Sequence, residues 1–367
     1  MSLKPLKIGI THGDINGIGY EVILKAFEDP RMAEICTPVI YGSAKIAAFY
    51  RKAMELPEVK LVTATTARNA REGEVNIVNV VPEDTHIEPG TLSKTAGEAA
   101  FTALEQAVAD LRAGDIDALV TAPICKEAIH SESFCFPGHT EYLEASLGEG
   151  NKSLMELCTA SGLRVALVTT HLPLSKISQS ITRENIVEKL TIFNRSLKAD
   201  FGINAPRIAV LALNPHAGDG GLLGTEETEI IAPAIADACQ QQILAFGPYA
   251  ADGFFGSDAY RHFDGILAMY HDQGLAPFKT MAMDAGVNFT AGLPYVRTSP
   301  DHGTGFDIAG KGEASAESMR EAIYMAIDIV RNRQRYATAT RNPLRKQYFE
   351  KGKDNVVLDL GENNKKE

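Results

Sequence analysis

The sequence lacks the features that mark several classes of protein. Its 367 residues contain five scattered cysteines and no CxxC pair, which favours reduced thiols over a disulfide framework. No apolar run approaches the roughly 20 residues of a membrane span. Residues 1–7 are polar and lead straight into a predicted strand, unlike a signal peptide. We therefore expect a cytoplasmic protein with no membrane partner.

Two common nucleotide-binding signatures are also missing. The segment from Gly13 to Gly19 has the spacing GxxxGxG rather than GxGxxG, and no GK[ST] follows it. A nicotinamide cofactor, if bound, would therefore be held by a scheme other than the Rossmann one. The net charge of −11 argues against nucleic acid as the main partner, although a local basic patch could still bind an anionic metabolite.

The composition that is present suits a soluble globular enzyme, with 45% hydrophobic and 23% charged residues. The chain exceeds the length at which one core usually stops growing, so we expect two domains. Short β-rich runs alternate with helical periods, which predicts an α/β fold with a mostly parallel sheet. Because no linker separates two domains, they would share a continuous sheet or exchange strands, with the active site in the cleft between them.

Local signals place the main elements. We expect strands at 7–11, 38–41 and 118–121 and before three histidines, and helices near 21–27, 43–54, 95–113, 140–147, 183–201, 225–241 and 315–333. Ser43 is expected to cap one helix, and Gly114 to end another.

Three histidines follow apolar runs that are typical of buried strands. These are His171, His216 and His271. Open α/β sheets bind ligands at the carboxyl ends of their strands, and imidazole is a common ligand of divalent metals. One such histidine alone would be read as an ordinary loop residue, but three in equivalent positions favour a three-histidine metal centre. Asp272 and Lys279 follow the third histidine and add acid–base chemistry beside it.

Three further segments could bind an anion or a nucleotide. Thr140 could cap the following helix, and with His139 it could hydrogen-bond a carboxylate or hydroxyl, although an ordinary helix cap explains this segment equally well. Arg297 offers a planar fork suited to phosphate or carboxylate, although an isolated arginine is normally a solvated surface charge. Residues 302–311 are rich in small residues and could approach a nucleotide or form a plain surface turn.

A long glycine-rich loop, residues 214–224, runs from His216 into a predicted helix that opens with Thr225, Glu226 and Glu227. Its glycines permit backbone close to a ligand. The two glutamates suit the positive N-terminus of that helix, so we interpret this pair as structural rather than catalytic.

Five motifs together resemble the 4-hydroxythreonine-4-phosphate dehydrogenase family of pyridoxal phosphate biosynthesis. They are GHTE at 138–141, TTHLPL at 169–174, NPHAG at 214–218, YHDQG at 270–274 and GLP at 292–294. The similarity extends over nearly the whole chain. Residues 13–21 depart from the family, because they read GDINGIGYE where the family commonly has GDPAGIGPE.

The resemblance implies the two-domain fold of the isocitrate and isopropylmalate dehydrogenases, with mostly parallel sheets and an interdomain cleft. Residues 1–130 and 285–367 would form a discontinuous first domain. Residues 131–284 would form a second domain that carries the metal ligands and the dimer interface. The family is homodimeric with a shared active site, and His271 is expected to serve the metal centre of the neighbouring subunit.

The resemblance also assigns roles to individual residues. One divalent metal per subunit (zinc, magnesium or cobalt) would be bound by His171, His216 and His271. Substrate would be contacted by His139, Thr140, Asp252, Lys279, Asn288 and Arg297. NAD or NADP would be bound by a loop that resembles an adenosine-binding loop and includes His302, Gly303, Thr304 and Asp307. The proton acceptor would be Lys279 or a water near Asp272.

The implied reaction is metal-dependent oxidation of 4-phosphooxy-L-threonine by NAD(P) to 2-amino-3-oxo-4-phosphooxybutanoate, which decarboxylates to 3-amino-2-oxopropyl phosphate. Relatives that oxidise 4-phospho-D-threonate or 4-phospho-D-erythronate share the metal and phosphate residues, so the amino group of the substrate stays open. A metal-dependent phosphatase would use the same histidines without NAD. A non-catalytic binding protein fits poorly with so many titratable residues in glycine-rich loops.

Overall fold

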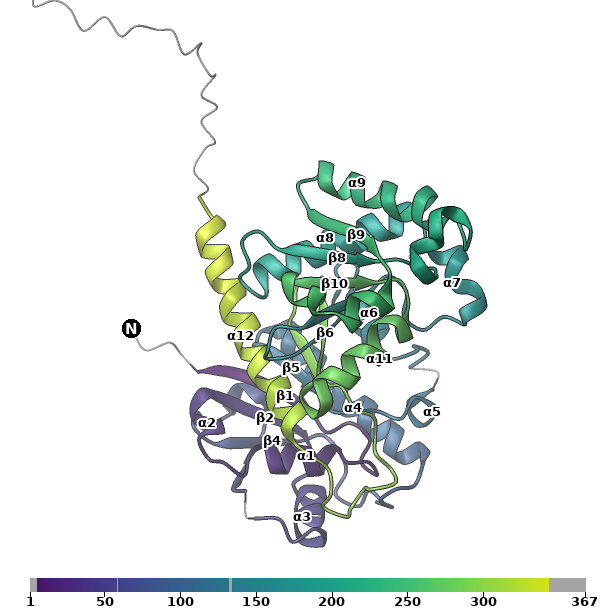
Figure 1. Cartoon of the computed structure of the whole chain (residues 1–367). Coiled ribbons are helices and arrows are strands. Elements are labelled where there is room, and N and C mark those ends of the chain that lie inside the picture. The colour runs from purple at the N-terminus through teal and green to yellow at the C-terminus, as the bar shows by residue number, and fades with distance from the viewer. Residues whose placement is uncertain (1–4, 58, 132–133, 343–367) are drawn as a thin grey trace, which may run out of the picture.

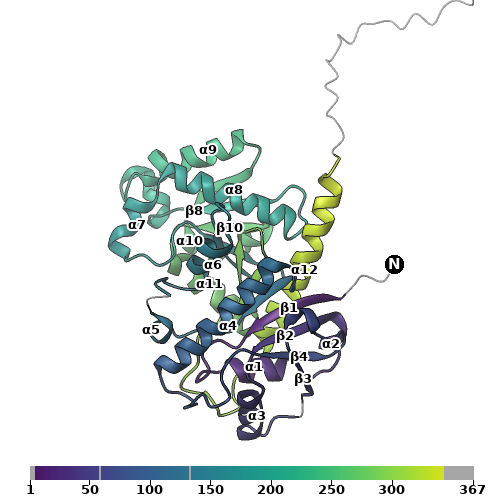
Figure 2. The same cartoon turned by 180° about the vertical axis from the view of Figure 1, so that it is seen from behind.

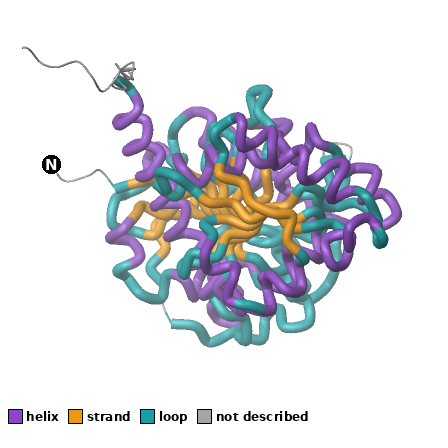
Figure 3. The backbone as a smooth tube through the Cα atoms, turned by 45° about the horizontal axis from the view of Figure 1, so that its top comes forward, coloured by secondary structure: helices purple, strands orange, loops and turns teal. Residues whose placement is uncertain are grey.

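A computed structural model describes residues 5–57, 59–131 and 134–342. In these residues twelve strands form one continuous sheet through the whole molecule, and helices cover both of its faces (Figure 1). Figure 3 shows the sheet as a central layer between helices. Within the same residues, no helix is long and apolar enough to cross a membrane. The predicted α/β class is confirmed.

The sheet has two parallel parts joined by antiparallel strands. The first parallel part runs in the order β3 (Leu61–Ala64), β4 (Val75–Asn79), β2 (Cys36–Gly42), β1 (Leu6–Thr11), β5 (Ala118–Thr121) and β12 (Arg297–Pro300). The junction is made by β11 (Val287–Ala291) and β6 (Leu154–Cys158). The second parallel part is β7 (Arg164–Leu167), β10 (Gly265–Ala268), β8 (Arg207–Leu211) and β9 (Leu244–Tyr249). Eight of the eleven strand pairs are parallel, as the sequence predicts.

The helices divide between the two faces of the sheet. One face packs against α1 (Gly19–Ala26), α8 (Arg183–Ala199), α9 (Ala232–Gln240) and α12 (Glu317–Thr340). The other face packs against α4 (Lys94–Ala113) and α6 (His139–Leu147) in the first half, and α10 (Ala251–Gly256) and α11 (His271–Ala282) in the second. Figure 2 shows α4 and α8 lying over different halves. The shorter or peripheral helices are α2 (Met32–Ile35), α3 (Ala44–Ala53), α5 (Lys126–Ile129) and α7 (Leu174–Ser180).

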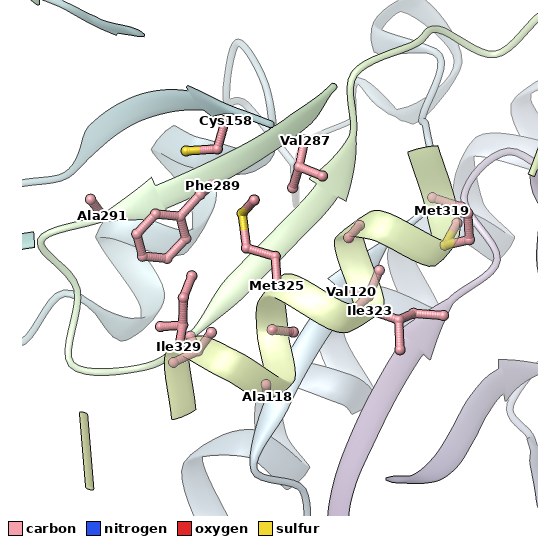
Figure 4. Packing of buried hydrophobic residues seen from close by; sticks show 14 of the residues in the cluster. Ala118, Val120, Cys158, Val287, Phe289, Ala291, Met319, Ile323, Met325 and Ile329 are labelled. Atoms are coloured by element: carbon pink, nitrogen blue, oxygen red, sulfur yellow. The ribbon is translucent and has the colours of Figure 1, made fainter. Parts of the chain in front are cut away.

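Helix α12 packs across both halves of the molecule. Its buried Met319 and Ile323 belong to the same apolar cluster as Val120 of β5 and Phe289 of β11 (Figure 4). Full burial of a side chain of this size stabilises the fold by about 1.5–3 kcal/mol. A single apolar cluster therefore covers one face of the sheet from the first half into the second, and the predicted boundaries between two domains stay a prediction.

Local capping follows the sequence closely. The Oγ of Ser43 accepts a hydrogen bond from the backbone N of Ile46 at the start of α3. Gly114 ends α4 in the left-handed conformation, with φ of 75°. The last helix, α12, begins near its predicted start but continues to Thr340, beyond the predicted end at residue 333.

Candidate active site

The three histidine-bearing strands are neighbours in the order β7, β10, β8, and all three are parallel. Their carboxyl ends therefore meet at one edge of the sheet, where side chains tie them together. Thr169 Oγ1 donates to the carbonyl of Met269 over 2.8 Å. Gln273 Oε1 accepts from the backbone N of Met269 (2.7 Å), and its Nε2 donates to the carbonyl of Ala212 (2.6 Å). The glutamine of the YHDQG motif thus links the end of β10 to the end of β8.

His171 and His271 lie next to each other, with ring centroids 6.0 Å apart. His171 Nδ1 lies 3.3 Å from Glu141 Oε1, and His271 Nδ1 lies 2.7 Å from Asp272 Oδ1. The hydrogen bond to His171 lowers the pKa of Glu141. A carboxylate at Nδ1 fixes the ring and leaves Nε2 as the electron-pair donor, which is the usual arrangement of a metal-binding histidine. This pair therefore fits two positions of the predicted metal centre.

His216 is placed differently. It is exposed and does not line the cleft that contains the other two histidines. Within residues 5–57, 59–131 and 134–342, no group of three His, Cys, Asp or Glu side chains could hold a metal ion. In one chain, then, the second histidine beside His171 is His271, whereas the resemblance led us to expect His271 to serve the neighbouring subunit. A third ligand would have to come from outside the cleft.

The cleft encloses about 330 Å³ and lies where the two halves meet. It is lined by nine of the predicted site residues, namely His139, Thr140, His171, His271, Lys279, Asn288, Arg297, His302 and Gly303. Within the part of the chain that the structure describes, several buried polar atoms around it have no hydrogen-bond partner, namely His139 Nε2, Glu141 Oε2, Asn288 Oδ1 and His302 Nε2. Since buried polar groups are normally paired, these atoms indicate a polar ligand.

Arg297 is a cationic group of the cleft that is suited to bind an anion. Its side chain is buried, which argues against the alternative interpretation as a solvated surface arginine. Its Nε and Nη2 donate to Thr121 Oγ1 (3.0 and 2.6 Å), and its Nη1 donates to Thr290 Oγ1 (3.1 Å). Burial lowers its pKa to about 9. Among the described residues, the hydrogen bonds of this buried cation go to neutral hydroxyls, so an anionic ligand would improve its charge balance.

The N-terminus of α6 supplies a second feature of the anion site. The helix begins at His139, and Gly138 occupies the N-cap position without a capping side chain. Thr140 lies inside the first turn, so its predicted role as the cap is wrong. Both residues nevertheless line the cleft together with the start of the helix, whose free N–H groups favour an anion. Burial, with the nearby Arg297 charge, lowers the pKa of His139 well below its usual range, so this imidazole is neutral at pH 7.

The two predicted acid–base residues fall in different places. Lys279 lines the cleft, and its Nζ lies 3.3 Å from Asp301 Oδ1 and 3.2 Å from the carbonyl of the same residue. Burial raises the pKa of Asp301. Asp272 holds His271 but does not line the cleft. With Asp252, it lines a separate cavity of about 540 Å³. In this chain Asp252 is therefore not next to the other predicted substrate residues.

The predicted cofactor loop packs against the glycine-rich turn of residues 13–19. The backbone N of Ile18 donates to the carbonyl of Thr304 (2.9 Å). A Cβ on Gly17 would lie 2.7 Å from that same carbonyl, so only glycine allows this approach. His302 and Gly303 reach the cleft, whereas Asp307 is exposed.

The residues of the site that the sequence analysis missed include Lys126 and Asp301, which line the cleft, and Thr121 and Thr290, which hold Arg297. Thr121 closes a predicted strand, which was an available signal, whereas Asp301 follows no strand that the sequence predicted. Lys126 and Thr290 carry no comparable signal.

Comparisons with known proteins identify the family of the chain. The family model described as "Pyridoxal phosphate biosynthetic protein PdxA" matches residues 34–326. A 4-hydroxythreonine-4-phosphate dehydrogenase of Bacteroides thetaiotaomicron is 59% identical over 98% of both chains. The "Putative D-threonate 4-phosphate dehydrogenase" of Cutibacterium acnes is 40% identical over 90% of this chain and 95% of its own. The crystal structure of 4-hydroxythreonine-4-phosphate dehydrogenase from Klebsiella pneumoniae has a TM-score of 0.76 and 34% identity, covering 89% of this chain and 99% of that one. The chain therefore belongs to the pyridoxal phosphate biosynthetic protein PdxA family.

Proposed function

We propose that the chain oxidises 4-phosphooxy-L-threonine with NAD or NADP. Hydride leaves C3 for the nicotinamide and the hydroxyl proton passes to a base, giving 2-amino-3-oxo-4-phosphooxybutanoate. The bond from C2 to the carboxylate then breaks, CO₂ leaves, and a proton is added at C2 to give 3-amino-2-oxopropyl phosphate. The observation that carries this proposal is the buried Arg297, whose described hydrogen bonds go to two threonine hydroxyls, in one cleft with two histidines that contact carboxylates.

The phosphate group would bind at the start of α6. Arg297 provides a fixed positive fork, and the N-terminal turn of α6 provides backbone donors together with Thr140. Neutral His139 has an unpaired Nε2 that can hydrogen-bond a phosphate or a hydroxyl. Lys126 adds a second positive charge to the lining of the cleft. Asn288 Oδ1, which is also unpaired, can accept from a substrate hydroxyl or ammonium group.

His171 and His271 would hold a divalent metal through Nε2, because their Nδ1 atoms face carboxylates. When bound, the metal would act as a Lewis acid that polarises the hydroxyl of the substrate and stabilises the enolate of the product. Lys279 would take the hydroxyl proton, and the 3.3 Å contact with Asp301 Oδ1 would orient its Nζ.

A homodimer would complete the site. Large apolar side chains are exposed in the two loops that follow His171 and His216, namely Leu172, Leu174, Leu222 and Leu223. The Ser178 Oγ to Glu226 Oε1 hydrogen bond (2.8 Å) joins these regions. An exposed apolar surface of this kind favours contact with another protein. We propose that a second copy covers it and that His216 and Asp252 of each copy serve the cleft of the other.

The nicotinamide cofactor would lie along the wall made by residues 302–311 and 13–19. These two glycine-containing segments are in direct backbone contact and adjoin the cleft through His302. Glycines allow a dinucleotide to approach the backbone closely.

One assay separates the candidate functions. NADH formation is followed with 4-phosphooxy-L-threonine, 4-phospho-D-threonate and 4-phospho-D-erythronate, with and without EDTA, while phosphate release is measured in parallel. We expect NADH with the first substrate, loss of activity in EDTA, and no activity in His271→Ala. His86→Ala, at an exposed histidine that also pairs with a carboxylate, is the matched control and should keep full activity.

Each alternative predicts another result. Turnover of only the second or third substrate would favour the threonate or erythronate dehydrogenase, the candidate supported by the name of the Cutibacterium acnes relative. Phosphate release without NAD would favour a phosphatase. Full turnover in EDTA would contradict the metal.

A further inference from the structure

The turn that carries His216 has a backbone conformation that its own residues disfavour. Six consecutive residues, 216–221, have positive φ values of 53, 52, 79, 44, 66 and 99°. Three of them, His216, Ala217 and Asp219, are not glycine. Such left-handed conformations are strained for residues with a Cβ and persist only where the surroundings hold them, often at functional sites.

The side chain of Glu227 lies directly against this turn. It is buried, and its Oε1 accepts hydrogen bonds from the backbone N atoms of Leu213 (2.8 Å) and Asn214 (2.7 Å). A Cβ added to Gly218 would lie 2.7 Å from Glu227 Oε2, so the backbone of the turn is in contact with the carboxylate. One buried carboxylate therefore joins the chain just after β8 to the middle of the strained turn.

Asn214 completes this contact. Its Nδ2 donates to Glu227 Oε2 (3.0 Å) and to Glu226 Oε2 (2.7 Å). Glu227 does not line the cleft, so it cannot touch substrate there in this chain. The interpretation of the acidic pair as structural is consistent with these bonds, but the segment that it holds is the one that presents His216.

We propose that Glu227 and Asn214 form a clasp that presets the orientation of His216 as a metal ligand. The inference rests on the proposed function, in which His216 completes the metal centre. Without the clasp, the turn would relax toward the right-handed region that its non-glycine residues prefer. Metal binding would then have to reorder the turn, and that conformational cost would appear as weaker affinity. Glu227 and Asn214 are thus positioning residues that act through His216.

The test is the affinity of the full-length protein for Co²⁺, measured by titration of its visible absorption. Glu227→Gln keeps the Oε1 acceptor but turns an NH₂ group toward Asn214 Nδ2. We expect it to weaken Co²⁺ binding by about 10- to 100-fold, the usual range for residues that orient a ligand. Glu229→Gln is the matched control, because Glu229 is exposed and its Oε2 accepts from Thr225 Oγ1 of its own turn (3.0 Å). It should bind Co²⁺ like the wild type.

Hydrogen exchange of the metal-free protein provides a readout without any metal. Peptides that cover residues 213–224 should exchange faster in Glu227→Gln than in Glu229→Gln, because the amides of Leu213 and Asn214 lose their charged acceptor. The melting temperatures of both variants should stay well above the assay temperature.

A second pair of variants tests the same clasp from the backbone side. Gly218→Ala places a methyl group against the Glu227 carboxylate, at φ of 79°. Gly202→Ala is its control, because Gly202 has a similar φ of 71° but its added methyl group meets open space. This variant therefore has the strain of the left-handed backbone without a new contact. We expect weaker Co²⁺ binding in Gly218→Ala alone, and this pair decides the question if Glu227→Gln does not fold.

The outcomes separate the clasp from the metal site itself. If His216→Ala weakens Co²⁺ binding but Glu227→Gln and Gly218→Ala bind like their controls, the clasp is overturned and the proposed metal centre stands. If His216→Ala binds Co²⁺ like the wild type, the role of His216 is overturned and the clasp with it.

Discussion

Replacing Arg297 by methionine should make the unliganded protein more stable while abolishing its affinity for phosphate. The side chain is buried, and its described partners are the neutral hydroxyls of Thr121 and Thr290. The fall of its pKa from 12.5 to about 9 corresponds to roughly 5 kcal/mol against the charged form, at 1.36 kcal/mol per pH unit. The variant also loses the hydrogen bonds to the two threonines, which offsets this gain by about 1 kcal/mol for each threonine. The expected gain in the free energy of unfolding is therefore about 2–3 kcal/mol.

The matched control is Arg333→Met. Arg333 is also partly buried, but its Nε lies 2.6 Å from Oδ1 of the buried Asp200. Removing this arginine leaves a buried carboxylate unpaired, which typically costs about 3–5 kcal/mol. Urea unfolding of both variants in phosphate-free buffer should therefore show changes of opposite sign.

Phosphate and pH give two further checks on Arg297. Inorganic phosphate should stabilise the wild type by about 2.7 kcal/mol at 100 times its dissociation constant, and should not stabilise Arg297→Met. Because the pKa is lowered in the folded state, the penalty is fully present below pH 9 and is relieved as the pH rises above that value. The stability advantage of Arg297→Met over the wild type should therefore shrink as the pH rises above 9. An Arg297→Met protein that is destabilised like Arg333→Met, or that phosphate stabilises like the wild type, would refute the reasoning.

Three other predictions concern the rest of the molecule. Burial lowers the pKa of His12 from 6.5 to about 4, so between pH 6.5 and pH 4 the unfolded chain takes up a proton that the folded chain does not. Urea unfolding should show that the free energy of unfolding of the wild type falls by roughly 3 kcal/mol over this pH range. His12→Phe keeps a ring against the stacked Tyr20 and should lose less stability over the same range. Gly97→Ala would drive a methyl group into the backbone of α5 and should lower the melting temperature strongly. Gly114→Ala is the control, because its methyl group meets open space and costs about 1 kcal/mol for the left-handed conformation. Similar falls in the melting temperatures of the two variants would contradict this packing. Lys279→Met should reduce kcat by about 100-fold or more and leave the half-buried Asp301 without this partner. Adding Asp301→Asn should restore the melting temperature but not kcat, and recovered kcat would rule out Lys279 as the base.

The local parts of the fold were predictable because their causes are local. Ser43 caps α3 and Gly114 ends α4 through contacts within a few residues of each. The alternation of apolar runs likewise predicted a mostly parallel sheet. The order β7, β10, β8 was not predictable, since strand neighbours are chosen by packing between distant segments. That order is nevertheless what brings the three histidine-bearing ends to one edge.

The site was predictable to the extent that family motifs mark it. They include residues that the structure brings together in the cleft, among them His139 and His171. Arg297 was singled out, but its burial depends on Thr121 and Thr290, whose hydroxyls no local pattern connects to it. Asp252 lies in another cavity, because a motif records which residues a family uses and not which of them one chain brings together.

The position of β12 has a consequence for how the chain is made. Its Arg297 and Thr298 pair with Leu119 and Val120 of β5, and its other side pairs with β11. During synthesis, the first half of the sheet therefore has an open edge at β5 until residues 297–300 leave the ribosome. An unpaired edge strand is a template for pairing with other chains, and contacts between distant segments form slowly. Chains that stop short of β12 should consequently be prone to aggregation, and the nascent first half is a natural client for a chaperone.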